Sequence, residues 1–309
     1  MMDFALTILG VNGAKPAFGR FPTSQFLQIQ NHFFLIDCGE GAQMRLSDFG
    51  MPASKVDHIF ISHLHGDHIF GLPGLLFSFA LNDRSKPLHV YSPPGLEQMI
   101  MAQLTPGGQL PFAVHFHVIP TDKSVLIFEN DALTVSTVPL IHRIPASGFL
   151  FREKQFQKNI IGEKISEHQL SIAQIKAVKQ GEDILLDNGK TLKNEELTHP
   201  DYIPRSYAFA SDTMYNEAMI PIINHVDLLY HETTFCEDRK ENAVITQHST
   251  AQEAATIARK ASVGKLITGH YSSRYKELDI FQDEAASIFG NTVLGLEGKT
   301  YKVGRLRKQ

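Results

Sequence analysis

Four side chains that can bind metal ions lie within six residues of one another, directly after an apolar run at 58–61. They are His63, His65, Asp67 and His68, and an apolar, helix-compatible stretch at 69–81 follows them. Open α/β sheets place their functional sites in such loops, between the carboxyl end of a strand and the next helix. Imidazole and carboxylate ligands suit zinc, with manganese or iron as substitutes. The cluster therefore predicts a metal site at the end of a buried strand.

Two ions need more ligands than one loop supplies, and three further candidates follow other strand-like runs. They are His142, Asp212 and His270, which come after the runs 133–138, 207–211 and 266–269. Each of them alone fits a structural role equally well, such as a turn aspartate or a capped histidine. Their shared position at strand ends favours ligands, and a carboxylate between two dications can bridge them. The predicted assignment is one site of His63, His65 and His142, a second of Asp67, His68 and His270, and Asp212 as the bridge.

The spacing of the apolar segments predicts an α/β fold. Short β-rich runs at 4–9, 26–30 and 33–36 indicate a meander. The runs at 58–61, 207–210, 228–230 and 266–268 lie between helix-like segments and are typical of buried strands. One helix is predicted at 251–260, because Thr250 and Glu253 form a T-x-x-E capping pattern and Gly264 comes shortly after an alanine-rich stretch.

Composition narrows the class of protein. With 309 residues, 43% of them hydrophobic, the chain can bury a full core, and without a linker or repeat we expect a single domain over 1–309. No apolar run approaches the length of a membrane span, and no leader-like opening is present, so we expect a cytoplasmic protein with no membrane partner. The two cysteines fit a reducing compartment. The net charge of -4 argues against a protein that coats nucleic acids, so any polyanion must be held by local patches.

Residues 152–202 form a polar insertion. An Asn-Gly pair at 188–189, flanked by β-forming residues, predicts a tight hairpin within it. A long insertion costs little stability, so it is either a tolerated surface excursion or an arm that binds something.

Further motifs carry a family resemblance. The HxHxDH motif at 63–68, followed by His, Asp and His in that order, is found in the metallo-β-lactamase superfamily. The chain resembles the ribonuclease Z branch of that superfamily through Asp-Cys-Gly-Glu-Gly at 37–41, Pro-Leu-Ile-His at 139–142, Ser-Asp-Thr at 211–213, His-Glu-Thr-Thr at 231–234, His-Ser-Thr at 248–250 and His-Tyr-Ser-Ser-Arg-Tyr at 270–275. These matches span nearly the whole chain.

The resemblance implies a four-layer αββα sandwich, with residues 152–202 as an inserted flexible arm, an exosite that holds the body of a transfer RNA. It implies a zinc-dependent endoribonuclease with two Zn²⁺ per subunit, which removes the 3′ trailer from precursor transfer RNA. The transfer RNA would keep a 3′-hydroxyl and the trailer a 5′-phosphate. It also implies a homodimer. The arm departs from the family pattern, because Ser171–Gln174 stands where a Gly-Pro pair is common and the arm has no basic excess.

A mechanism follows as a hypothesis. Asp67 would orient the attacking water and accept its proton. His248 would protonate the leaving 3′ oxygen and Glu232 would position or tune it, unless the two form only a structural hydrogen-bonded pair. Arg274 would hold a phosphate, assisted by Ser272. The basic residues near the C-terminus fit RNA contact and a solvated terminus equally well: Lys299, Lys302, Arg305, Arg307 and Lys308.

Two alternatives stay open, because fold and metals do not fix the substrate. One is a small-molecule phosphodiesterase or esterase of the same superfamily, which the absent Gly-Pro pair favours slightly. The other is a non-catalytic RNA-binding scaffold that keeps its metals for structure. Asp67 argues against the scaffold, because closed structural sites do not require such a carboxylate.

Overall fold

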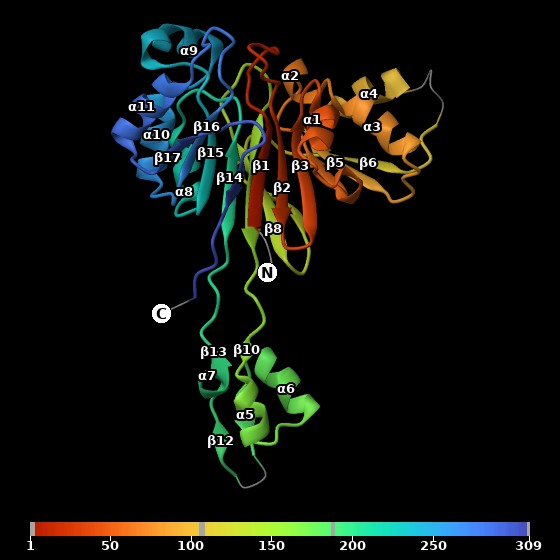
Figure 1. Cartoon of the computed structure of the whole chain (residues 1–309), viewed down its shortest axis with the longest axis vertical. Helices are drawn as coiled ribbons and strands as arrows, with labels where there is room; N and C mark the ends of the chain where they lie inside the picture. Colours follow the sequence, from red (N-terminus) through yellow and green to blue (C-terminus); the bar gives the residue numbers. More distant parts are fainter. Residues whose placement is uncertain (1–3, 105–108, 187–188, 308–309) are drawn as a thin grey trace.

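The computed structural model describes residues 4–104, 109–186 and 189–307. Two seven-stranded sheets pack face to face, and helices cover the outer face of each (Figure 1). One end of the sandwich carries α2 (Gly66–Ile69) and α9 (Lys240–Thr246), and a slender arm projects from the opposite end. The predicted αββα sandwich is confirmed.

The first sheet begins as an antiparallel meander and continues with parallel strands. Its order is β18-β1-β2-β3-β4-β5-β6, and the pairing from β3 onward is parallel. The predicted meander at the start of the chain is therefore confirmed. The strands are β1 (Phe4–Gly10), β2 (Ser24–Ile29), β3 (His32–Cys38), β4 (His58–Phe60), β5 (Leu88–Ser92), β6 (Val114–Val118) and β18 (Thr300–Lys302).

The second sheet has the order β17-β16-β15-β14-β9-β8-β7. Its strands β14 to β17 are parallel, so their carboxyl ends meet at one edge. The strands predicted near 133, 207, 228 and 266 all lie in this sheet. The strands are β7 (Leu126–Glu129), β8 (Leu133–Pro139), β9 (Ser147–Glu153), β14 (Ser206–Ala210), β15 (Leu228–Glu232), β16 (Leu266–Gly269) and β17 (Thr292–Leu294).

The helices of the sandwich lie mainly on its two outer faces (Figure 1). The predicted helix at 251–260 is α10, and both halves of its capping box form: Thr250 Oγ1 accepts from Glu253 N at 3.2 Å, and Glu253 Oε2 accepts from Thr250 N at 3.0 Å. The helices are α1 (Ala42–Asp48), η1 (Ala53–Lys55), α2 (Gly66–Ile69), α3 (Leu72–Leu81), α4 (Leu96–Leu104), η3 (Glu217–Met219), α8 (Ile220–Ile223), η4 (Glu237–Arg239), α9 (Lys240–Thr246), α10 (Ala251–Lys260) and α11 (Asp279–Ile288). No helix in the described ranges is long and apolar enough to cross a membrane.

The helix-compatible stretch 69–81 is helical over most of its length, as α3. The helix is interrupted between α2 and α3, at Phe70 and Gly71. Gly71 lies against β3, where its N–H donates to Cys38 O at 2.9 Å and a Cβ would lie 2.1 Å from Gly39 O. This close approach turns the chain between the ligand loop and α3, which a periodicity argument does not detect.

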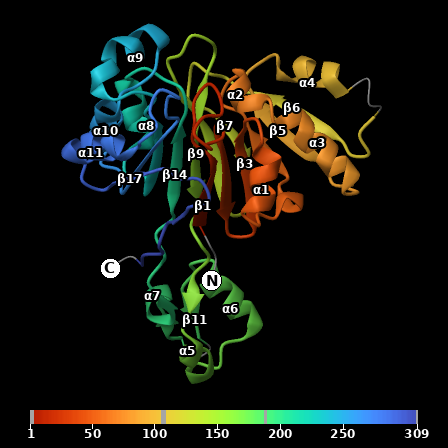
Figure 2. The ribbon, with the colours of Figure 1, turned by 45° about the horizontal axis from the view of Figure 1, so that its top comes forward.

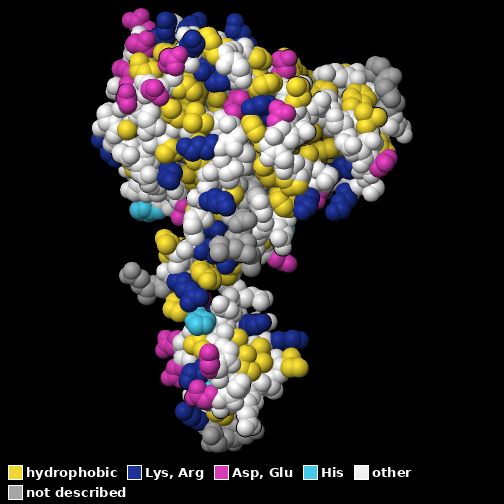
Figure 3. Space-filling view, viewed as in Figure 1, with side chains coloured by type: hydrophobic (Ala, Val, Ile, Leu, Met, Phe, Trp, Pro, Cys, Tyr) yellow, Lys and Arg dark blue, Asp and Glu magenta, His cyan; other side chains and the backbone are white. Residues whose placement is uncertain are grey.

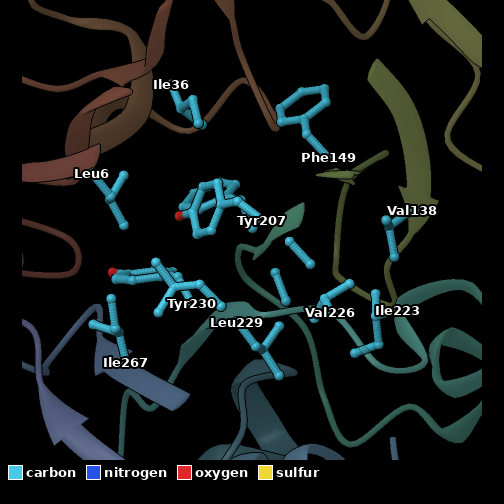
Figure 4. Packing of buried hydrophobic residues seen from close by; sticks show 14 of the residues in the cluster. Leu6, Ile36, Val138, Phe149, Tyr207, Ile223, Val226, Leu229, Tyr230 and Ile267 are labelled. Carbon is cyan, nitrogen blue, oxygen red and sulfur yellow. The ribbon is translucent and has the colours of Figure 1, made fainter. Parts of the chain in front are cut away.

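Two hydrophobic cores hold the layers together. Successive side chains of a strand point to opposite faces, so Phe34 and Ile36 of β3 enter the core between the sheets, while Leu35 enters the core under α1, α3 and α4. Figure 4 shows the central core, in which Tyr207 lies between Leu6 and Ile36 of the first sheet and Ile223 and Val226, which precede β15. The cores fix both sheets relative to each other, and with them the strand ends that carry the ligands.

The arm is a small folded unit at the end of two extended limbs (Figures 1 and 2). Its own hydrophobic cluster includes Leu170, Val178 and Leu197. The predicted hairpin is present as β11 and β12, which pair antiparallel, although Asp187 and Asn188 of its turn lie outside the described residues. The arm elements are β10 (Asn159–Ile160), α5 (Gly162–Glu167), α6 (Ile172–Lys179), β11 (Ile184–Leu185), β12 (Thr191–Leu192), α7 (Asn194–Leu197) and β13 (Thr198–His199).

The C-terminal segment packs against the base of the arm. Ile203 N donates to Leu306 O at 2.8 Å, and Tyr202 forms an isolated antiparallel bridge with Arg307. The guanidinium of Arg305 lies 4.5 Å from the ring centroid of Tyr202 and 4.4 Å from that of Phe156. The backbone of the basic segment is therefore held against the base of the arm up to residue 307, while the side chains of Lys299, Lys302 and Arg307 are exposed to solvent. Lys308 lies outside the described residues.

Candidate active site

The predicted metal ligands all follow strands that end at the same end of the sandwich. The loop 63–68 follows β4, and His142, Asp212 and His270 follow β8, β14 and β16. Figure 2 brings this end forward and shows α2, which carries part of the ligand loop, close to the middle of the sandwich. Residues up to about 200 positions apart in sequence are thereby brought into contact.

The ligand atoms form the two groups that the sequence predicts. Those of His63, His65, His142 and Asp212 all lie within 4.8 Å of one another, and so do those of Asp67, His68 and His270. The ligand atoms of Asp212, His248 and His270 also lie within 4.8 Å of one another and form a third group.

Asp212 lies between the two predicted groups, with one carboxylate oxygen facing each. Its Oδ2 is 3.5 Å from His63 Nε2 and 3.8 Å from His142 Nε2. Its Oδ1 is 3.1 Å from His270 Nε2 and 3.4 Å from His68 Nε2. This arrangement suits a bridging carboxylate.

The carboxylates of Asp37, Asp67 and Asp212 concentrate negative charge around His68, which fits bound cations. Burial lowers the pKa of His63 well below its ordinary value. Burial alone would raise the pKa of Asp212, but the charges of His270 and His68 lower it well below the ordinary value. Burial also opposes a charge on His68, yet the carboxylates of Asp67, Asp212 and Asp37 raise its pKa well above the ordinary value. A proton on His68 thus balances negative charge that a dication would balance instead.

The surroundings of one buried nitrogen also fit a bound metal ion. His68 Nε2 is buried with no hydrogen-bond partner, and it points between carboxylate oxygens of Asp67 and Asp212 at 3.5 and 3.4 Å. A buried nitrogen without a partner is costly unless something else binds it. The donor set and this orphaned nitrogen both fit divalent metal ions.

Other side chains and one backbone carbonyl contact the ring nitrogens of the candidate ligands that face away from the predicted metal positions. None of these groups was assigned a role from the sequence. His68 Nδ1 lies 2.7 Å from Asp37 Oδ2, and that carboxylate also accepts from Ser62 N and Oγ at 2.7 and 2.9 Å. His142 Nδ1 donates to Gln247 O at 2.9 Å. His270 Nδ1 lies 2.9 Å from Thr234 Oγ1. Such partners fix the ring orientation and the tautomer of a ligating histidine. The sequence offers a signal only for Asp37 and Thr234, which stand in the quoted motifs at 37–41 and 231–234.

Glu232 is fully buried and receives hydrogen bonds from several donors at once. Its carboxylate accepts from the backbone N–H groups of Thr213, Thr234 and Ser249 at 3.1, 2.8 and 3.0 Å. His248 Nδ1 lies 2.9 Å from Glu232 Oε1. Burial opposes the charge on His248, but Glu232 and Asp212 raise its pKa to about 9. The predicted pair is therefore in contact, with the imidazole beside the metal-ligand groups.

An open cavity of about 480 Å³ exposes this chemistry to solvent. Asp67, His248 and His270 line it, as do the predicted phosphate-binding residues Arg274 and Ser272. Ser272 Oγ accepts from Arg274 N and Nη1, both at 3.4 Å. Two exposed cations that the sequence reasoning missed, Lys15 and Arg143, also line the cavity. Phosphates entering here meet positive charge at the rim and ligand groups at the floor.

Comparisons with protein-family models and with curated proteins both find relatives of this chain. The model of a family described as Anti-Pycsar protein Apyc1 matches residues 4–158. Ribonuclease Z of Cytophaga hutchinsonii is 46% identical over 305 residues, covering 98% of this chain and 97% of that protein. Ribonuclease Z of Bacteroides fragilis is 41% identical over 298 residues, covering 96% of this chain and 98% of that protein.

Solved structures share the architecture. Human tRNase Z, short form (ELAC1), superposes with a TM-score of 0.70 at 26% identity and covers 96% of this chain and 98% of its own. The metallo-β-lactamase fold protein YhfI of Bacillus subtilis has a TM-score of 0.70 at 19% identity, with 98% and 100% coverage, and shows the fold alone. The identity over nearly the full length of both curated relatives, together with the shared fold, shows that the chain belongs to the ribonuclease Z family within the metallo-β-lactamase fold.

Proposed function

We propose that this protein is a zinc-dependent endoribonuclease that removes the 3′ trailer from precursor transfer RNA. The observation that carries the proposal is the position of Asp212, whose two carboxylate oxygens face two separate ligand groups at the floor of a cavity rimmed by cations. A chain of the ribonuclease Z family with such a site is equipped for phosphodiester hydrolysis.

The residues would hold two Zn²⁺ ions per subunit, with manganese or iron as substitutes. His63, His65 and His142 would hold one ion, Asp67, His68 and His270 the other, and Asp212 would bridge them. When bound, the ions would lower the pKa of water toward neutrality and offset charge on the phosphate. The chain's own contribution is to orient these ligands and to position the substrate.

Asp67 and His248 would carry the proton transfers. Asp67 Oδ2 accepts a hydrogen bond from Ala14 N at 2.6 Å, which fixes the carboxylate at the cavity wall. From there it would orient the attacking water and accept its proton. His248 would protonate the leaving 3′ oxygen, and Glu232 would keep its imidazole oriented and charged. Arg274, with Ser272 beside it, would hold a phosphate. The products would be a 3′-hydroxyl on the transfer RNA and a 5′-phosphate on the trailer.

The arm and the subunit arrangement belong to the same proposal. Residues 152–202 would act as an exosite for the body of the transfer RNA, within one domain spanning 1–309. The protein would work as a homodimer in the cytoplasm. Its two cysteines, Cys38 and Cys236, are buried and unpaired, which fits a reducing compartment.

The test is a cleavage assay with a 3′-extended precursor transfer RNA, with product ends mapped and metal content measured on the same sample. We expect one endonucleolytic cut, the end groups given above, and two zinc ions per chain. A chelator should abolish the cut and added zinc should restore it.

The same assay separates the alternatives. No cut in the precursor, together with efficient hydrolysis of bis(p-nitrophenyl) phosphate, would indicate a small-molecule phosphodiesterase. Binding of the precursor with hydrolysis of neither substrate would indicate a metal-bearing scaffold.

A further inference from the structure

The arm that would hold the transfer RNA has no excess of basic residues. Residues 152–202 contain eight Lys and Arg against nine Asp and Glu. Several of the arm's cations are already paired, as in Lys158 with Asp201 at 2.9 Å and Lys193 with Asp183 at 2.8 Å. Because contacts with phosphates supply most of the sequence-independent affinity for nucleic acids, a second and more basic surface would add to the affinity that the arm can supply.

The segment 298–307 has the opposite composition. It contains Lys299, Lys302, Arg305 and Arg307 and no acidic residue. Lys299 and Lys302 are exposed. In a chain with a net charge of -4, this is a local concentration of positive charge.

These cations are fixed in position. β18 pairs with β1, with Leu6 opposite Tyr301, and the buried Tyr301 ties the strand to the core. Val303 N donates to Phe4 O at 2.9 Å. Beyond it the segment follows the base of the arm, as described above. The segment therefore presents its charges on an ordered backbone that leads from the sandwich to the arm.

A groove lies beside this segment. It has a volume of about 510 Å³, and Lys265, Lys299 and Lys302 are among its lining residues. Asp227 also lines it, but its Oδ2 is occupied by Ser206 N and Oγ at 2.7 and 2.8 Å. Figure 3 shows dark blue side chains in a column on this face, from the sandwich down to the arm.

We propose that this surface, here called the basic groove and made of Lys265 and residues 299–307, binds the sugar-phosphate backbone of the RNA between the arm and the sandwich. The inference rests on the proposed function and adds a second RNA-binding surface to it. The groove would supply affinity without base recognition, because exposed lysines contact phosphates as point charges.

The test uses charge reversal in the full-length, zinc-loaded protein. The double variant Lys299→Glu, Lys302→Glu is compared with Lys86→Glu, Lys123→Glu, two exposed lysines outside the groove. The probe is the product transfer RNA, which has no trailer to remove. Its Kd is measured by fluorescence anisotropy between 50 and 300 mM salt. Over this range, binding through phosphate contacts weakens by orders of magnitude.

Loss of two phosphate contacts should weaken binding about 10- to 30-fold near physiological salt and reduce the slope of log K against log salt by about 2. KM for the precursor should rise in parallel, while kcat and the turnover of bis(p-nitrophenyl) phosphate stay within about twofold, since the chemistry is unchanged. The control pair should leave all of these at the wild-type values.

Equal Kd and equal salt slope in the two double variants would overturn the proposal. The neutral double variant Lys299→Gln, Lys302→Gln is the control for misfolding. It should retain the thermal midpoint of the wild type and show a smaller increase in Kd. Failure of the proposed function has a separate readout: the wild-type protein would then leave the precursor uncut, while the Kd values still decide whether the groove binds RNA.

Discussion

Hydrogen-bond partners on the side away from the predicted metal positions orient the candidate ligand histidines. Asp37, Thr234 and the carbonyl of Gln247 each contact the ring nitrogen of a ligand that faces away from its predicted metal position. When the imidazole is neutral, as a metal ligand must be, each contact favours the tautomer whose other nitrogen carries the free electron pair. The affinity of the site should therefore depend on residues that never touch a metal.

Replacing Asp37 with Asn tests this dependence. Asp37 has a φ of 54°, a left-handed conformation that Asn tolerates, so the backbone should be retained. The amide would place N–H₂ against Ser62 Oγ or His68 Nδ1, and we expect zinc affinity to fall about 10- to 100-fold. Competition with a chelating fluorophore measures it. Asp57→Asn, at an aspartate paired with Arg84 at 2.7 Å outside the site, is the matched control and should retain wild-type affinity. Equal affinities in the two variants would show that Asp37 does not support the ligand.

The role of His248 as an acid is testable through the leaving group. A ribose 3′ oxygen needs a proton on departure, whereas p-nitrophenolate leaves without one. His248→Ala should thus slow precursor cleavage about 10²- to 10⁴-fold and change bis(p-nitrophenyl) phosphate hydrolysis much less. A parallel loss with both substrates would instead indicate a structural or ligand role, as the group Asp212, His248 and His270 allows.

The pH dependence has a definite sign. The raised pKa of His248, about 9, keeps the acid form present at neutral pH, and that form is lost as pH rises. Bound dications oppose protonation, so the fall in kcat for the precursor should lie at or below pH 9. This fall in kcat at alkaline pH should be absent from the hydrolysis of bis(p-nitrophenyl) phosphate. An identical alkaline limb with both substrates would contradict the assignment.

At the level of secondary structure, the interruption of the helix between α2 and α3 sets the position of the loop 63–68. Gly71 contacts the backbone of Gly39, and no side chain fits there. Gly71→Ala would force Cβ to within 2.1 Å of a carbonyl oxygen, so α2 must shift. We expect a loss of more than about 2 kcal/mol in the free energy of unfolding, together with weaker zinc binding.

Gly162→Ala is the control for this change, because a Cβ at the start of α5 meets nothing within 4 Å. Urea denaturation should find that variant as stable as the wild type or slightly more stable. A stable Gly71→Ala with normal zinc content would mean that the loop adapts without cost.

At the scale of the whole molecule, the arm and the active site lie at opposite ends of the sandwich (Figure 1). The arm has its own hydrophobic cluster, and its two limbs meet where the rings of Phe156 and Tyr202 are 6.3 Å apart. A short Gly-Ser linker can therefore replace residues 158–200 without straining the sandwich. The catalytic groups and the basic groove would remain in place.

This replacement should separate substrate docking from chemistry. We expect kcat/KM for the precursor to fall about 100-fold or more, because binding energy from remote parts of a substrate is lost, while bis(p-nitrophenyl) phosphate is hydrolysed as before. Unchanged precursor cleavage would remove the arm from the docking proposal. Loss of both activities would show that the arm stabilises the sandwich instead.

Much of the fold and of the site was predictable from local pattern. The capping box of α10 and the strands before His142, Asp212 and His270 follow from short-range spacing, and the structure agrees with each. The interruption of the helix-compatible stretch 69–81 at Phe70 and Gly71 was not predicted, because it depends on contact with Gly39, a partner that periodicity cannot identify. The contact of Asp37 with His68 was not predicted for a similar reason, since the motif at 37–41 does not show which side chain its aspartate meets.

The sequence by itself determined the types of the candidate ligands, their order and their positions at strand ends, because strand and helix periodicity are local properties of the chain. Only the tertiary structure decided that Asp212 turns one oxygen to each ligand group, that Asp37 holds His68, and that residues 305–307 lie along the base of the arm. These contacts join segments far apart in sequence. Their distances are set by how two sheets pack on a shared core, which no local pattern specifies.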